Sequence, residues 1–189
     1  MGGWERDDVA TKTHTSAVVL MPPPDVWEPI QAIRRRHDRQ YRRWMPHVTL
    51  LYPFRPREQF GDAAAALAQA CRAVEPFQVE LAEIRTFERP GDCVLWLAPE
   101  PAEALRRLHE ALWRAVPDCD DLRAFPDGFT PHLSVGQARP ERLGELLAGL
   151  QRGWRPLRFQ ATDIGLIYRR QPPDDVFRVD RTILLGCRP

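Results

Sequence analysis

Apolar positions divide the chain into strand-like and helix-like segments from one end to the other. Short apolar or alternating runs that end in proline or glycine predict strands, and apolar residues at three- and four-residue spacing predict helices. The predicted strands are 15–21, 47–54, 77–87, 93–98, 130–137, 157–168 and 176–186, and the predicted helices begin near residues 25, 62, 101 and 140. This mixture of elements indicates an α+β fold.

Local signals support several of these boundaries. Asp25, followed three residues later by Glu28, is typical of a capping box at a helix start. Residues 90–92 (PGD) predict the turn of a hairpin between strands 77–87 and 93–98. No linker-like or low-complexity stretch divides the chain, so residues 1–189 are expected to form one domain. The polar residues 1–13 are expected to be a flexible leader.

Composition narrows the class of protein. The chain has 189 residues, of which 43% are hydrophobic, and this is enough apolar material for a core. The 27 basic and 26 acidic residues nearly cancel, so extensive binding to duplex nucleic acid is not implied. The four cysteines form no CxxC pair, which argues against a structural zinc site and a disulfide framework. Without a membrane-length apolar run or a signal sequence, we expect a cytoplasmic protein with no membrane partner.

One short pattern occurs twice in the chain. Residues 46–50 read PHVTL and residues 131–135 read PHLSV, so each has proline, histidine, an apolar residue, a hydroxyl and an apolar residue. From composition, on the order of 0.005 matches are expected by chance. The repeat therefore points to two equivalent strands in a duplicated structure.

The period of a strand places the polar side chains of each motif together. His47 and Thr49 project to one face, as do His132 and Ser134, while the apolar residues between them face the other way. We expect Gly136, two residues beyond Ser134, to leave room beside the polar pair. Two such strands side by side would bring two imidazoles and two hydroxyls to one cavity.

These groups suit phosphate ester chemistry without a metal or cofactor. A neutral imidazole can take a proton from water while a protonated imidazole gives one to the leaving oxygen, and only histidine offers both forms near pH 7. The hydroxyls of Thr49 and Ser134 can donate hydrogen bonds to phosphate oxygens, where charge accumulates in the transition state. The chain contains no Walker loop, no HExxH motif and no clustered metal-ligand carboxylates.

The paired H-x-[ST] motifs resemble those of the 2H phosphoesterase superfamily, in its 2′-5′ RNA ligase and cyclic phosphodiesterase branch, and the resemblance covers nearly the whole chain. It implies a bilobal fold with pseudo-two-fold symmetry, two antiparallel-rich sheets facing a central cleft, and helices outside. It also implies that His47 and His132 are catalytic and that Thr49 and Ser134 orient the phosphate. Many bacterial members have a basic residue shortly after the second motif, where this chain has Gln137.

The resemblance implies metal-independent hydrolysis of 2′,3′-cyclic phosphates or 2′-5′ phosphodiester bonds at RNA or nucleotide ends, reversible as 2′-5′ ligation. The expected partners are such RNA ends or small nucleotides, bound by a monomer. Three alternatives remain: an RNA 3′-end exonuclease using the same histidines, a non-catalytic nucleotide- or RNA-binding module, and a metal hydrolase. The sequence does not say which histidine is the base.

Other polar residues are weaker candidates. Arg169 and Arg170, expected at the end of a long strand, are candidate phosphate contacts, and Tyr168 and Trp44 are candidate stacking surfaces for a base. The arginines between positions 34 and 43 can guide RNA phosphates or form a solvated helix face. His37 and His109 lie on or beside helical apolar stripes, which favours packing roles for both.

Overall fold

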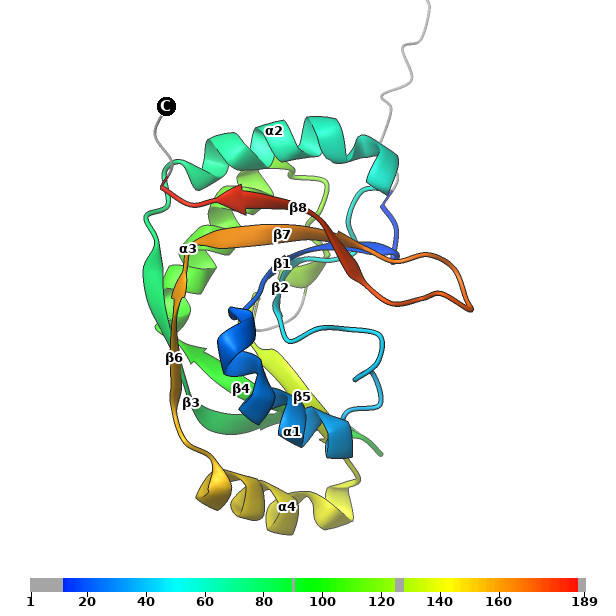
Figure 1. The fold of residues 1–189 in the computed structure, drawn as a ribbon, viewed down its shortest axis with the longest axis vertical. Helices are drawn as coiled ribbons and strands as arrows, with labels where there is room; N and C mark the ends of the chain where they lie inside the picture. Colours follow the sequence, from blue (N-terminus) through cyan, green and yellow to red (C-terminus); the bar gives the residue numbers. More distant parts are fainter. Residues whose placement is uncertain (1–11, 90, 125–127, 187–189) are drawn as a thin grey trace, which may run out of the picture.

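The computed structural model describes residues 12–89, 91–124 and 128–186, and shows two four-stranded sheets with helices around them (Figure 1). All strand pairs in both sheets are antiparallel. The strands are β1 (Ser16–Leu20), β2 (Val48–Leu51), β3 (Phe77–Phe87), β4 (Cys93–Glu100), β5 (Leu133–Ala138), β6 (Leu157–Ala161), β7 (Asp163–Tyr168) and β8 (Arg178–Leu184). The α-helices in these ranges are α1 (Trp27–His37), α2 (Phe60–Cys71), α3 (Ala102–Ala115) and α4 (Pro140–Gly153).

The two sheets repeat one arrangement. Their strand orders are β2-β1-β7-β8 and β5-β4-β3-β6, so each motif strand, β2 or β5, is an edge strand of its sheet. The helices α2 and α4 lie at opposite ends of the molecule, each beyond the sheet of its lobe (Figure 1). The bilobal α+β fold with duplicated sheets is therefore confirmed.

A shared apolar core joins the lobes. It includes Val18 and Leu50 from the first sheet and Leu95 and Val135 from the second, all of them fully buried. Burying this apolar surface stabilises both sheets together, because the same core would be opened by separating them. None of the helices in the described ranges is long and apolar enough to cross a membrane.

The expected strand at 157–168 is two strands in different sheets. β6 pairs with β3 in the second sheet, whereas β7 pairs with β1 and β8 in the first. The chain passes from one lobe to the other at Thr162, between the two strands. A continuous run of strand-forming residues does not indicate which strand each half pairs with, so the sequence did not predict the division into β6 and β7.

Two other boundaries also differ from expectation. Asp25 lies in a 3₁₀ turn over Pro24–Val26, and α1 begins after Val26 with no side-chain cap, so the predicted capping box is wrong. The strand predicted over 47–54 ends at Leu51. Pro53 follows soon after, and a proline cannot donate a ladder hydrogen bond.

Part of the expected leader belongs to the fold. Thr13 forms an isolated antiparallel bridge with Phe54, and Lys12 forms an ion pair with Asp121. The rest of the leader, residues 1–11, lies outside the described residues.

Each motif strand is braced by a helix from the other half of the chain. The C-terminal end of α1 packs on β5 so closely that a Cβ on Gly136 would lie 2.6 Å from the His37 Cβ. The expectation that Gly136 leaves room beside the polar pair is therefore wrong, because the end of α1 packs directly against the backbone of Gly136. Reciprocally, α3 packs on β2, where His109 Nδ1 donates a hydrogen bond to the Leu50 carbonyl over 2.8 Å.

Candidate active site

The two motif histidines have the same backbone anchor. His47 Nδ1 lies 2.7 Å from the carbonyl oxygen of Met45, and His132 Nδ1 lies 2.9 Å from that of Thr130, two residues upstream in both cases. A carbonyl only accepts hydrogen bonds, so Nδ1 carries the proton in each ring. The neutral tautomer therefore presents an unprotonated Nε2, the form that can accept a proton.

Both motif strands have a bulge directly after the hydroxyl residue. In β2 the pairing with β1 skips Leu50, and in β5 the pairing with β4 skips Val135. A bulge changes the phase of side-chain alternation, because one residue of the strand has no direct partner. As a result Ser134 and Gln137 line the same cavity, while the intervening Gly136 is turned toward α1.

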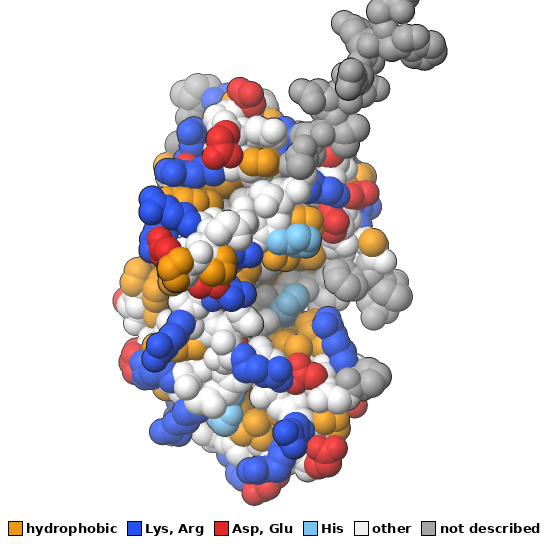
Figure 2. Space-filling view, turned by 90° about the vertical axis from the view of Figure 1, so that its right-hand side faces the viewer, with side chains coloured by type: hydrophobic (Ala, Val, Ile, Leu, Met, Phe, Trp, Pro, Cys, Tyr) orange, Lys and Arg blue, Asp and Glu red, His pale blue; other side chains and the backbone are white. Residues whose placement is uncertain are grey.

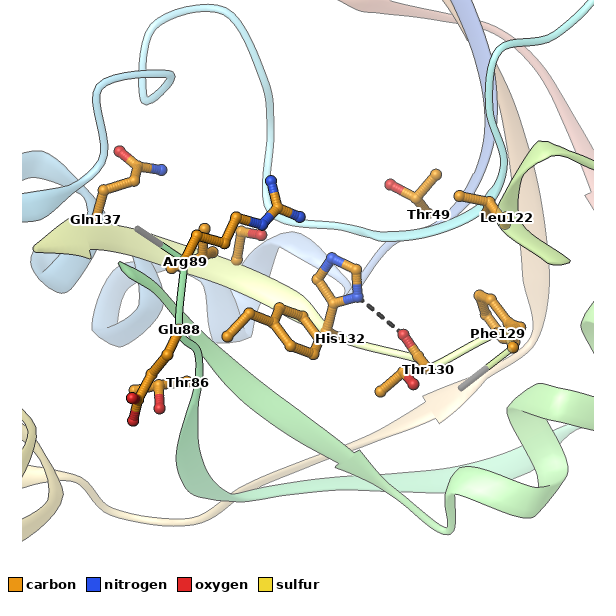
Figure 3. A pocket seen from close by; sticks show the side chains of 13 residues that line it. Thr49, Thr86, Glu88, Arg89, Leu122, Phe129, Thr130, His132 and Gln137 are labelled. Atoms are coloured by element: carbon orange, nitrogen blue, oxygen red, sulfur yellow. Dashed lines mark hydrogen bonds between the residues drawn. The ribbon is translucent and has the colours of Figure 1, made fainter. Parts of the chain in front are cut away.

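A cavity of about 690 Å³ lies between the lobes beside these strands. Thr49 of the first motif and His132 and Ser134 of the second line it together. Figure 3 shows Thr49 and His132 entering from opposite sides, and Figure 2 shows a face of the molecule hollowed near its middle, with histidine side chains visible there. The two lobes thus contribute equivalent residues to one pocket. The other lining residues are Thr86, Phe87, Glu88, Arg89, Val94, Leu122, Gly128, Phe129, Thr130 and Gln137.

His47 is not among the residues that line this cavity. Its ring stacks on Trp44, with centroids 4.7 Å apart, and Trp44 in turn stacks on Phe177 at 3.7 Å. This aromatic stack holds the imidazole plane beside the start of β2. A charge on His132 lowers the pKa of His47, so the two imidazoles are close enough to interact electrostatically.

Burial favours the neutral form of both imidazoles. It lowers the pKa of His47 from its ordinary value to about 4, against the opposing hydrogen bond to the Met45 carbonyl. Burial also lowers the pKa of His132, and the positive charge of Arg89 adds to this effect. At neutral pH without a bound anion, both rings are therefore poised to accept a proton.

The neighbourhood of His132 is aromatic as well. Phe87 approaches it edge-on with ring centroids 5.1 Å apart, and Trp96 lies at 6.0 Å. On the other side of the cavity, Phe129 stacks on His109 at 4.0 Å. Phe87 and Trp96 shield this side of the imidazole from water, and such burial lowers its pKa.

Comparisons with known proteins identify the family. Residues 22–173, more than half of the chain, match the model of the 2′-5′ RNA ligase superfamily. The chain belongs to this superfamily. A relative from Oceanobacillus iheyensis, named "Putative phosphoesterase OB1230", is 26% identical and is aligned over 89% of this chain and 96% of its own. Another from Geobacillus kaustophilus, "Putative phosphoesterase GK0864", is 29% identical over 65% of this chain and 69% of its own.

Solved structures share the fold of this 2′-5′ RNA ligase superfamily member. TT0787 of Thermus thermophilus has a TM-score of 0.63 at 20% identity, covering 91% of this chain and 98% of its own. LigT of E. coli in its apo form has a TM-score of 0.60 at 16% identity, covering 94% of this chain and 100% of its own. At these identities the likeness concerns the fold alone.

In this superfamily member, the four residues considered as further substrate contacts do not line the cavity. Trp44 packs on His47, and Arg169 lies over the Phe177 ring at 5.7 Å, on the same side of the site. Tyr168 is covered by the guanidinium of Arg57, 4.0 Å from its ring centroid. Arg170 is exposed beside Asp174. The structure thus brings Trp44 and Arg169 near the first motif but does not bring Tyr168 or Arg170 to the pocket.

The arginine-rich stretch from Arg34 to Arg43 begins in the last turn of α1, and one of its members has a structural role. Arg34 is only 2% exposed and forms an ion pair with Asp38 at 2.8 Å. Its Nη2 also donates to the Trp44 carbonyl at 2.9 Å, which fixes the segment leading to the first motif. Arg39 pairs with Asp92 on the hairpin between β3 and β4. Arg35 and Arg36 of α1 are exposed, as expected of a solvated helix face, whereas Arg34 is not.

Sequence reasoning missed Arg89, Thr86 and Phe129 as lining residues. Arg89 and Thr86 lie on or just beyond the end of β3, and Phe129 lies shortly before the second motif. The sequence signal for Arg89 was its place beside the predicted hairpin turn, but that position does not say which way the side chain points. Among the described residues, no group of three or more His, Cys, Asp or Glu side chains is arranged to hold a metal ion.

Proposed function

We propose that this protein hydrolyses 2′,3′-cyclic phosphates at the ends of RNA or of small nucleotides. The observation that carries the proposal is the pair of equivalent motifs, each with its Nδ1 tied to a carbonyl and its Nε2 left for proton transfer. E. coli LigT, which shares the fold, has been crystallised with 3′-AMP and with phosphate. A nucleotide phosphate is therefore a reasonable ligand for the pocket between the lobes.

The proposed reaction needs one proton acceptor and one proton donor. Nε2 of one imidazole takes a proton from water while the water oxygen forms a bond to phosphorus. The bond from phosphorus to one ribose oxygen breaks, and the second imidazole gives that oxygen its proton. Solvent then restores the two rings to their starting states. With an RNA 5′-hydroxyl as the nucleophile in place of water and the ribose 3′-oxygen as the leaving group, the same steps would form a 2′-5′ link.

The hydroxyls of Thr49 and Ser134 complete the proposed phosphate site. Both line the cavity from strands of different lobes, so both are available to an incoming oxygen. Donors held in place before the reaction stabilise charge as it develops on the phosphoryl oxygens. His47 and His132 are the proposed catalytic residues. Because burial lowers the pKa of both rings in the free protein, the ring that serves as the acid takes up a proton when the anionic phosphate binds.

The test is turnover of nucleoside 2′,3′-cyclic phosphates and of an oligoribonucleotide with a terminal cyclic phosphate, followed by ³¹P NMR. His47→Ala and His132→Ala should each lower kcat by about 10²- to 10⁴-fold, the usual contribution of a general acid or base. His37→Ala is the matched control, because it removes an imidazole at the end of α1 that belongs to neither histidine motif and does not line the cavity. It should retain wild-type turnover.

Other outcomes would replace the proposal. Progressive shortening of the oligonucleotide would make the protein an exonuclease. Tight nucleotide binding without turnover of any cyclic phosphate would make it a binding module. Loss of activity in a chelator, restored by a divalent ion, would make it a metal hydrolase.

A further inference from the structure

One guanidinium lines the cavity among the described residues, that of Arg89. Arg89 follows the end of β3 by two residues and precedes the turn that leads into β4. Figure 3 shows its side chain reaching from this hairpin over the cavity, with the guanidinium above the ring of His132 and facing the side from which Thr49 enters. The hairpin therefore places a permanent positive charge between residues of the two lobes.

This charge has no carboxylate partner among the described residues. Neighbouring arginines differ in this respect, because Arg39 pairs with Asp92 and Arg43 with Asp175. Glu88 also lines the cavity, but Figure 3 shows its carboxylate turned away from both Arg89 and His132. The charge of Arg89 acts on the site, because it helps to lower the pKa of His132.

The second motif strand supplies no cation of its own. Gln137 is the lining residue of β5 beyond Ser134, and both ends of its amide are already used. Its Oε1 accepts a hydrogen bond from the Arg39 backbone N–H at 3.0 Å, and its Nε2 donates to Asp38 at 3.3 Å. Gln137 therefore ties β5 to the end of α1, and the charge that an anionic ligand requires must come from elsewhere.

We propose that Arg89 is the phosphate-binding cation of this site, supplied by the β3–β4 hairpin rather than by the second motif strand. The inference rests on the proposed function for the identity of the substrate, but not for the binding of phosphate itself. A guanidinium can donate two parallel hydrogen bonds to two phosphoryl oxygens, leaving the others for the hydroxyls of Thr49 and Ser134. It would also counter the negative charge that develops during transfer.

The position of Arg89 gives it a second effect on the reaction. In the free protein its charge opposes protonation of His132. A bound phosphate neutralises that charge and adds a negative one beside the ring, which raises the pKa of His132. The imidazole would then gain a proton only when substrate is present. Arg89 thus acts both as a ligand for the phosphate and as a device that couples binding to protonation.

The experiment compares Arg89→Met and Arg89→Lys with the unaltered protein. Binding of inorganic phosphate is measured by calorimetry, the pKa of His132 by NMR titration, and kcat and KM with a nucleoside 2′,3′-cyclic phosphate. Arg89→Met should weaken phosphate binding about 10- to 100-fold and raise the pKa of His132 in the free protein. Arg89→Lys should keep part of the affinity, because it retains the charge without the planar fork.

Arg85→Met is the matched control. Arg85 lies on β3, the strand that precedes Arg89, pairs with Glu83 and does not line the cavity, so its loss changes the net charge equally without removing a lining residue. It should leave phosphate binding and the His132 titration unchanged. An equal loss of phosphate affinity in Arg85→Met and Arg89→Met would overturn the inference, since the effect would then be one of net charge.

The same data separate this inference from the proposed function. Phosphate affinity within about twofold of wild type in Arg89→Met would refute the role of Arg89, even if cyclic phosphates are hydrolysed in a histidine-dependent way. Conversely, Arg89-dependent phosphate binding in a protein that turns over no cyclic phosphate would support the role of Arg89 and refute the proposed function.

Discussion

Gly136 allows a direct test of how tightly α1 is seated on β5. A methyl group added here would lie 2.6 Å from the His37 Cβ and 2.9 Å from the His37 carbonyl oxygen. Non-bonded carbon atoms are in favourable contact at about 3.5–4.0 Å. The neighbouring atoms belong to the backbone and Cβ at the end of a helix, so a change of rotamer cannot relieve the overlap. Gly136→Ala therefore requires α1 and β5 to move apart.

We expect Gly136→Ala to lower the free energy of unfolding by about 1–3 kcal/mol, the usual cost of overpacking a well-packed contact. Gly149→Ala is the matched control, because it adds the same methyl group in α4 with nothing within 4 Å. In a helix interior, alanine is more favourable than glycine by about 0.5–1 kcal/mol. The two substitutions should therefore change stability in opposite directions.

Urea unfolding followed by circular dichroism measures both free energies under one set of conditions. The reasoning would be refuted if Gly136→Ala matched or exceeded the wild-type stability, since the end of α1 would then be free to shift at no cost. A loss of stability equal in both variants would also refute it. That result would mean that the added methyl, and not the close approach of His37, is responsible.

Three further predictions concern titratable groups. The pKa values of His47 and His132 are lowered in the free protein, so kcat/KM should fall as pH rises from about 5 to about 8. Bound phosphate favours the protonated ring, so kcat should have a higher pH optimum than kcat/KM. His109→Leu should lower the unfolding free energy in urea by about 1–3 kcal/mol, since it leaves the buried Leu50 carbonyl without its donor. Burial raises the pKa of the Cys71 thiol to about 12, so a thiol reagent should label it only as fast as the protein unfolds.

Each of these predictions has a contrary result. A kcat/KM optimum above that of kcat would show that the free imidazoles titrate normally or that the acid is another group. Wild-type stability in His109→Leu would mean that the Leu50 carbonyl finds another donor. Rapid labelling of Cys71 in native buffer, at a rate unaffected by low urea, would contradict its burial.

The elements with a clear local signal were predictable from the sequence. β3 occupies 77–87 as predicted, since apolar and polar positions alternate along it and the chain turns directly afterward. The motif strands also alternate as expected: Val48 and Leu50 are fully buried, while Thr49 between them is partly exposed. In the motif strands one face meets the core and the other bears the hydroxyl that lines the cavity, and in both cases burial and sequence have the same period.

Features that depend on contacts between distant segments were not predictable. The division of 157–168 between two sheets depends on which strands receive each half. The bulges at Leu50 and Val135 depend on pairing with β1 and β4, and the one at Val135 turns Gln137 rather than Gly136 to the cavity. The histidine motifs were visible because they repeat, whereas Arg89 reaches the pocket only through the direction of a hairpin.

The reciprocal seating of α1 on β5 and of α3 on β2 has a consequence for dividing the chain. A fragment that ends before β4 would contain the first histidine motif without the helix that buttresses it, and the complementary fragment would have the same deficiency. Neither piece is expected to keep its imidazole aligned in isolation. Mixing the two fragments could restore the pocket only by rebuilding both interfaces at once, so the two repeats are mutually dependent halves of one folding unit.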